Sequence, residues 1–224
     1  AHAGVSYHVS ALNGDDTNDG KSPARAWQSL DKANAVELKP GDSLLLESGS
    51  VFKGQLKPKG TGIMANGEIQ TVSVGSYGAS GSRPRIDGEG RVNAAVLLYN
   101  VEGFSIRDLE ITNTGPTLEA GRYGLLVLND SLQVARHFQV ENLYIHDVNG
   151  AYKKDNDSVG AIHFLAKNGR DQSMPSTRFH DIRVEKCHIK DCSRNGIIII
   201  GGPKARQNWA PATRVVVRNN LIEG

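Results

Sequence analysis

A segment of seven or eight residues recurs four times in this chain, and its recurrence constrains the fold more than any other feature. The copies begin at Ile106, Val140, Val184 and Val217, so successive starts lie 34, 44 and 33 residues apart. The shared pattern is apolar, polar, turn-former or Lys, small or apolar, any residue, Ile, any residue, polar. Each copy is typical of two short strands that meet at a bend. Self-similarity at such a period indicates a repeat architecture.

Three of the four copies are followed by a further short strand that starts with glycine, at 124–128, 160–164 and 196–200. One coil of a stacked β-solenoid needs roughly twenty residues, so the remainder of each period forms protruding loops. Each coil buries its apolar side chains only by stacking on its neighbours. A doubly wound α/β fold would need a helix between strands, and a β-sandwich would need antiparallel hairpins. The repeat therefore predicts an all-β fold, a right-handed parallel β-helix.

One amphipathic helix is expected before the strands begin. Its apolar positions recur near helical spacing, Ser29 can serve as N-cap, and Pro40 with Gly41 ends it. We expect this helix to plug the open end of the stack, with an N-terminal cap over 1–41 and coils over 42–224 of a single domain. The repeat still runs at the last residue, so we expect missing C-terminal coils or a partner chain to cover that end. The helical positions are Trp27, Leu30, Ala33, Asn34 and Leu38.

Composition excludes several classes of function. Lys and Arg total 26 against 24 for Asp and Glu, and the basic residues form no block, which disfavours nucleic-acid binding. The longest aliphatic run, Ile197–Ile200, is far too short for a membrane span of about 20 residues. Two cysteines, Cys187 and Cys192, are too few for a disulfide framework, and we expect two small buried side chains.

Several segments together resemble a known group of proteins. The resemblance covers essentially the whole chain and rests on Tyr7–Ser10, Gly14–Asp16, Leu38–Asp42, Phe52–Leu56 and Pro84–Gly88. These resemble the secreted bacterial right-handed β-helix proteins of the pectate-lyase-like superfamily, which include polysaccharide lyases, glycoside hydrolases, epimerases and adhesins. The resemblance implies a long groove that receives a polysaccharide or oligosaccharide, and a secreted, periplasmic or cell-surface location. The aspartate signatures of pectate lyases and polygalacturonases cannot be matched residue by residue.

The resemblance directs attention to the strand after Gly160 and its flanking loops as the wall that faces substrate. The loop before it contains Lys153, Lys154, Asp155 and Asp157. Cations that neutralise a sugar carboxylate beside a base that removes the adjacent proton suit β-elimination on a uronate. A solvated charged turn has the same composition.

His163 lies within that strand. If Ile162 and Phe164 point inward, His163 faces the groove and can act as an acid or base near neutral pH. The opposite phase would turn it into the interior as a structural histidine.

Substrate-binding residues are expected beside the same strands. Lys167, Arg170 and Arg194 suit an anionic or hydroxyl-rich glycan, and Tyr152 and Trp209 suit stacking on sugar rings. Each can instead anchor a loop.

Three functions remain open. A lyase acting on a uronate-containing glycan uses the Lys/Asp loop. A glycoside hydrolase needs two carboxylates, for which Asp155, Asp157, Asp147 and Asp191 are candidates, although the last two can simply close turns. A non-catalytic glycan-binding or adhesive solenoid needs only the groove. The sequence indicates no cofactor with certainty; Ca²⁺ is the one candidate, because the turn-rich run 13–20 could bind it, and the same run can be a solvated turn.

Overall fold

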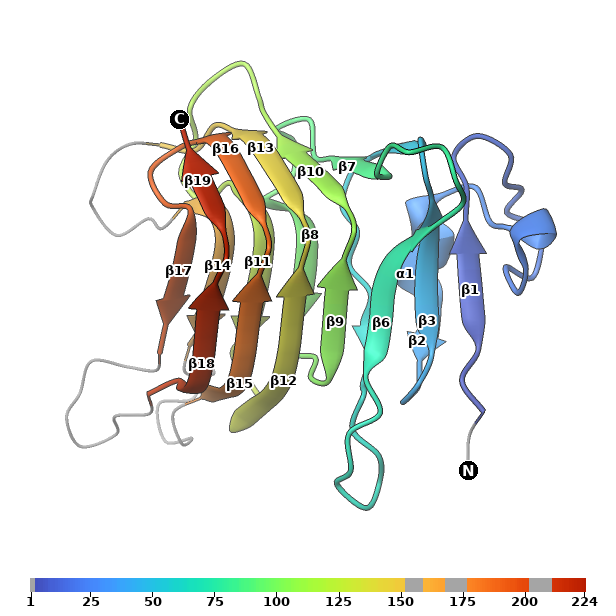
Figure 1. Cartoon of the computed structure of the whole chain (residues 1–224), viewed down its shortest axis with the longest axis horizontal. Helices are drawn as coiled ribbons and strands as arrows, with labels where there is room; N and C mark the ends of the chain where they lie inside the picture. The colour runs from blue at the N-terminus through green and yellow to red at the C-terminus, as the bar shows by residue number, and fades with distance from the viewer. Residues whose placement is uncertain (1–2, 152–158, 168–176, 202–210) are drawn as a thin grey trace.

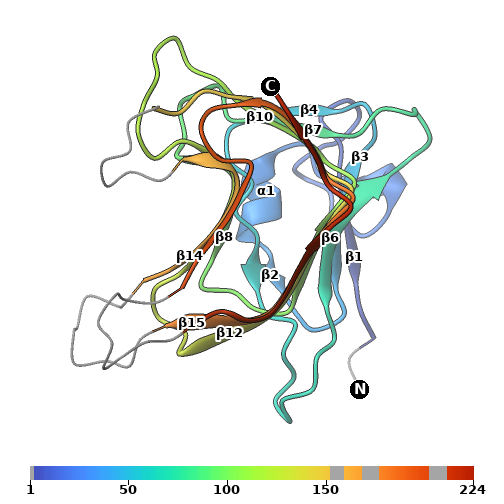
Figure 2. The same ribbon diagram turned by 60° about the vertical axis from the view of Figure 1, so that its left-hand side comes forward.

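The chain forms a stack of coils whose strands line up into three parallel sheets around one interior (Figures 1 and 2). The computed structural model describes residues 3–151, 159–167, 177–201 and 211–224. All pairings between named strands of the three sheets are parallel. The parallel stacking predicted from the repeat is confirmed.

The three sheets take one strand each from successive coils. The first sheet runs β1 (Ser6–Val9), β3 (Ser43–Glu47), β6 (Val72–Tyr77), β9 (Phe104–Arg107), β12 (Val134–Glu141), β15 (Arg178–Glu185), β18 (Thr213–Arg218). The second runs β4 (Val51–Lys53), β7 (Arg85–Asp87), β10 (Glu110–Asn113), β13 (Tyr144–Val148), β16 (His188–Cys192), β19 (Leu221–Glu223). The third runs β8 (Ala94–Tyr99), β11 (Tyr123–Asn129), β14 (Gly160–Ala166), β17 (Ile197–Ile200). A separate pair is β2 (Glu37–Leu38) with β5 (Lys59–Gly60).

The interior is built from apolar side chains repeated at equivalent positions. Ile106, Val140 and Val184 are register partners on neighbouring strands, and all are buried. Phe138, Phe164 and Phe179, from the first and third sheets, pack edge-to-face with ring centroids 5.5–5.7 Å apart. Burying these faces by stacking supplies the main stabilising free energy of a solenoid.

Each repeat bends between its two strands at the position the pattern assigns to a turn-former. Asp108, Asn142, Lys186 and Asn219 all have left-handed backbone, with φ from 54° to 58°. Asn142 donates from Nδ2 to Asp108 Oδ1 at 2.8 Å, so bend residues of adjacent coils bind each other. The predicted bend is confirmed, and it turns the chain from the first sheet into the second.

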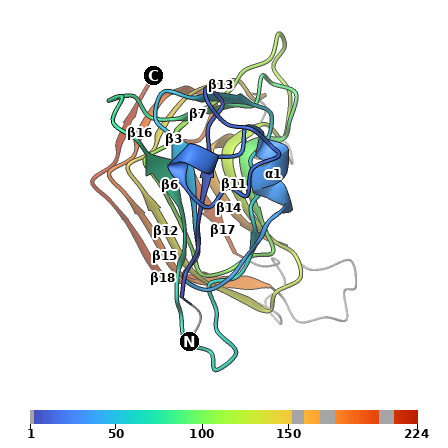
Figure 3. The same cartoon turned by 90° about the vertical axis from the view of Figure 1, so that its right-hand side faces the viewer.

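The helix is much shorter than the sequence pattern predicts. Helix α1 spans Leu30–Ala35, after a short 3₁₀ turn η1 (Pro23–Arg25), and Ser29 caps it by accepting a hydrogen bond from the Lys32 amide. Trp27 and Leu38 lie outside it, because Trp27 forms a bridge with Val9 and Leu38 belongs to β2. Leu30 and Ala33 still pack into the core. Figure 3 views α1 from the N-terminal end of the stack.

The two ends of the stack differ in how far their apolar side chains are covered. Strand β1, within the segment predicted as cap, already pairs with β3 in the first sheet. In the last coil, Val217, Leu221 and Ile222 are 47–55% exposed. Both thiols are free; Cys187 is buried as predicted, whereas Cys192 is only half-buried. None of the helices in the described ranges is long and apolar enough to cross a membrane.

Candidate active site

Most of the site residues predicted from sequence lie outside the residues that the structure describes. These are Tyr152, Lys153, Lys154, Asp155, Asp157, Arg170 and Trp209. Their assigned roles remain predictions. Three predicted site residues, His163, Lys167 and Arg194, are described.

His163 points away from the core, as the first of the two phases predicts. Ile162 and Phe164 belong to the core, whereas His163 lies between Leu126 and Ile198 on neighbouring strands. The imidazole is nevertheless fully buried, and neither ring nitrogen has a hydrogen-bond partner among the residues that the structure describes. Burial, and then the Lys167 charge, lower the pKa of His163 to about 4. The imidazole is therefore buried and does not line an open groove as predicted, and its role as an acid or base stays a prediction.

Lys167 and Arg194 are both exposed near the ends of third-sheet strands. Lys167 follows β14, and its amide donates to the Asn129 carbonyl at 2.7 Å. Arg194 precedes β17 and has left-handed backbone with φ 69°. Both can reach solvent, so their roles in glycan binding stay open as predictions.

A different face of the coil brings carboxylates together. On the outer side of the second sheet, Asp87 of β7, Thr112 of β10 and His146 of β13 are register partners and form one row across three coils. Neighbouring strands lie about 4.8 Å apart, which places Asp87 and His146 roughly 10 Å apart at the backbone. Thr112, a short side chain, stands between them.

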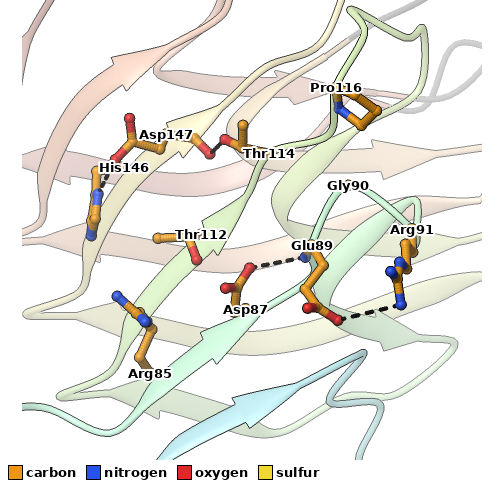
Figure 4. Close-up of a pocket in the computed structure, with 10 residues that line it drawn as sticks. All are labelled: Arg85, Asp87, Glu89, Gly90, Arg91, Thr112, Thr114, Pro116, His146 and Asp147. Carbon is orange, nitrogen blue, oxygen red and sulfur yellow. Dashed lines mark hydrogen bonds and ion pairs between the residues drawn. The ribbon is translucent and has the colours of Figure 1, made fainter.

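An open hollow of about 780 Å³ lies over this row (Figure 4). Its walls come from β7, β10 and β13 and from the segments that follow β7 and β10. The lining residues are Arg85, Asp87, Glu89, Gly90, Arg91, Thr112, Thr114, Pro116, His146 and Asp147. Four are acidic or basic groups from the β7 segment, so a polar ligand is the natural occupant.

His146 is held between two carboxylates. Its Nδ1 lies 2.6 Å from Asp147 Oδ2, and its Nε2 lies 2.8 Å from Glu110 Oε1. Ionised carboxylates only accept hydrogen bonds, and a neutral imidazole has one N–H. A neutral imidazole between two ionised carboxylates can make only one of these two hydrogen bonds. For both to form, the three side chains must hold one more proton, on the imidazole or on one of the carboxyl groups. Glu110 also lies 3.8 Å from Arg85 Nη1.

Asp147 is presented to solvent by a β-bulge. The pairing of β10 with β13 shifts register after Thr112, and Asp147 adopts φ 50°. Its side chain is 61% exposed, and the Thr114 hydroxyl donates to its backbone carbonyl. Bulges are frequent beside active sites because they redirect one side chain out of the regular alternation.

The two carboxylates of the β7 segment have different partners. Asp87 Oδ1 accepts a hydrogen bond from the Glu89 amide at 2.9 Å. Glu89 is paired with Lys53 at 3.1 Å and with Arg91 at 3.9 Å. Asp87 thus faces the hollow without a described cationic partner, whereas Glu89 is neutralised by cations.

Asp87, Glu110 and Thr112 were not predicted from the sequence as site residues, and Asp147 was predicted only as an alternative carboxylate of a hydrolase. The available signal was the pattern itself. In each repeat, the residues before and after the Ile of the pattern, such as Ile111 and Ile145, point outward. Polar residues at those positions in successive coils therefore form rows on the outer face.

The carboxylates of the N-terminal turn bind the protein itself. Asp15 accepts from Thr17, Asp16 from the amides of Gln28 and Ser29, and Asp19 pairs with Arg25 at 3.2 Å. Across the described part of the chain, no three His, Cys, Asp or Glu side chains are placed to share a metal ion. Calcium binding remains a prediction.

Comparisons of sequence and of structure both find similarity to lacto-N-biosidases. No protein-family model matches the sequence. A curated lacto-N-biosidase from Bifidobacterium longum subsp. longum is 28% identical over 295 aligned residues, covering 99% of this chain and 18% of that protein. The chain resembles part of a lacto-N-biosidase. Native GH136 lacto-N-biosidase from Eubacterium ramulus superposes with a TM-score of 0.81 at 25% identity, over 97% of this chain and 41% of that one. Its selenomethionine derivative gives 0.80 at 26% identity, over 96% and 41%.

These relatives support the prediction of a carbohydrate-active enzyme on a parallel β-helix. They favour the glycoside hydrolase alternative over β-elimination on a uronate. Because the chain spans well under half of each relative, the activity of the whole protein is a matter for proposal.

Proposed function

We propose that this β-helix belongs to a glycoside hydrolase that acts on an oligosaccharide, with the hollow over β7, β10 and β13 as its active site. The similarity to lacto-N-biosidases supports the reaction class. The observation that carries the site is the row in which Asp87 faces the His146–Asp147 pair across Thr112.

Hydrolysis of a glycosidic bond needs an acid that protonates the leaving oxygen and a base that activates water or attacks directly. The His146–Asp147 pair suits the acid, because Asp147 is exposed and its Oδ2 lies 2.6 Å from His146 Nδ1. Asp87 suits the base, since its described contact is a single amide donor. In each turnover the proton passes from the Asp147–His146 pair to the departing sugar, while Asp87 takes a proton from the attacking water.

The reaction class is tested by product analysis of the full-length protein. An aryl lacto-N-bioside and a panel of plant, algal and animal glycans serve as substrates. New reducing ends without ultraviolet absorption support hydrolysis. An unsaturated, ultraviolet-absorbing product would instead establish the uronate lyase, and binding with neither product would leave the non-catalytic solenoid.

A secreted, periplasmic or cell-surface location fits a glycan substrate.

A further inference from the structure

Arg122 is a buried cation at the edge of the hollow. It immediately precedes β11 and is 2% exposed. Its one described acidic neighbour is Glu119, at 3.4 Å, whose side chain is 62% exposed. A buried guanidinium is costly unless its donors are satisfied, so the partners of Arg122 reveal what it holds in place.

Those partners belong to three segments far apart in sequence. Arg122 Nη2 donates to the Gly90 carbonyl at 2.9 Å. Its Nη1 donates to the Thr117 carbonyl at 2.7 Å, and to the carbonyl and side-chain oxygen of Asn149 at 2.9 and 2.7 Å. One planar group thus joins the turn after β7, the loop after β10 and the chain after β13.

The same three segments are tied to one another beside the guanidinium. Asn149 Oδ1 accepts from the Gly115 amide at 2.9 Å, and Asn149 Nδ2 donates to the Gly115 carbonyl at 2.6 Å. A Cβ on Gly90 would lie 2.2 Å from Gly115 Cα, and a Cβ on Gly115 would lie 2.6 Å from Arg122 Nη2. Only glycine at positions 90 and 115 therefore allows these two segments to approach each other and Arg122 this closely.

Each joined segment also carries part of the hollow. Gly90 follows Asp87 by three residues, Asn149 follows Asp147 by two, and the loop after β10 supplies Thr114 and Pro116. We propose that Arg122 is a positioning residue that fixes the separation of the Asp87 and Asp147 carboxyl groups. This inference rests on the proposed function of the hollow. The planar fork is essential, because an ammonium presents a single point of charge and cannot hold acceptors on two nitrogens.

The test compares Arg122→Lys and Arg122→Met with Arg136→Met, in the full-length protein. Arg136 is a matched control, because it also spans two coils by pairing with Glu102 at 3.3 Å and does not line the hollow. Misplacement of a catalytic group by about 1 Å can cost on the order of 100-fold in rate. We expect kcat on the aryl lacto-N-bioside to fall about 100-fold in both Arg122 variants, with KM changed far less. Arg136→Met should keep the wild-type kcat.

Rates are measured well below the unfolding temperature of each variant, so that a purely structural role would leave kcat of the folded molecules unchanged. Folded Arg122 variants with wild-type kcat would overturn the inference. If Arg122→Met does not fold, Asn149→Ala removes the shared acceptor without removing the cation and should show the same fall in kcat.

Amide hydrogen exchange separates this inference from the proposed function. Arg122→Lys should accelerate exchange together in 88–93, 114–122 and 147–151, and Arg136→Met should not. Should the wild-type protein hydrolyse nothing, the proposed function fails, while concerted loosening would still show that Arg122 sets the geometry. Unchanged exchange in all three segments would refute the positioning role directly.

Discussion

Asp87 and His146 lie in one row on the outer face of the second sheet, with Thr112 between them. The row is perpendicular to the strands, so the two side chains stand on opposite sides of the same hollow (Figure 4). A sugar residue placed over Thr112 would meet a carboxylate on one side and a proton-carrying His–Asp pair on the other. Parallel stacking creates this geometry, because it places equivalent positions of successive coils about 4.8 Å apart.

Burial of His163 makes the stability of the protein depend on pH. The pKa of His163 is about 4 in the folded protein against 6.5 for a free histidine, so the unfolded chain binds the proton more readily. Stability is therefore lost as pH falls below about 6.5. Between pH 7 and pH 5, protonation of this histidine in the unfolded chain should lower the free energy of unfolding by up to about 2 kcal/mol. His163→Leu, which matches its neighbours Leu126 and Ile198, should abolish that part of the pH dependence. Urea unfolding at both pH values measures this, and an unchanged pH dependence in the variant would refute the assignment.

The bend ladder predicts a stabilising substitution at Lys186. Its φ of 55° is unfavourable for most residues with a side chain, whereas Asn at the equivalent positions 142 and 219 tolerates it. Lys186→Asn loses an exposed ion pair with Glu141, which contributes roughly 0–1 kcal/mol. We expect a net gain of about 0.5 kcal/mol in the free energy of unfolding. Lys190→Asn, at a position without positive φ, is the control; equal effects would show that backbone conformation is not the cause.

The two cysteines should be unreactive in the folded protein. Burial raises the pKa of Cys187 to about 11 and that of Cys192 to about 12, and the thiolate is the reactive form. At neutral pH, Ellman's reagent should label neither thiol until denaturant is added, and then both. Rapid labelling of either in the native state would show that this part of the second sheet opens readily.

The stack and its bends could be predicted because their signal is local. Each repeat carries its own apolar, turn-forming and Ile positions, so Asp108 and Asn142 could be aligned before any contact was known. The helix was predicted too long for the opposite reason. Trp27 stacks on Tyr7 at 5.2 Å and donates from Nε1 to the Asn18 carbonyl, so long-range partners override its helical spacing.

The hollow could not be predicted from the same pattern. Its row takes one residue from each of three coils, and the loops between those coils differ in length. The register that aligns Asp87 with Thr112 and His146 is set by which apolar side chains pack inside, not by sequence distance. The bulge that exposes Asp147 adds one unpaired residue to the strand, and the periodicity of the sequence does not predict it.

The proposed hydrolysis depends on the carboxylates of the hollow, and Asp191 provides a close control for them. Asp191 occupies the place of Asp147 one coil later, with φ 49° against 50°, and does not line the hollow. The decisive measurement is the kcat of Asp87→Asn, Asp147→Asn and Asp191→Asn for release of sugar from an aryl lacto-N-bioside. We expect the first two to lose about 10²–10⁴-fold and the third to match the wild type. Wild-type hydrolysis by both hollow variants would contradict the proposed active site.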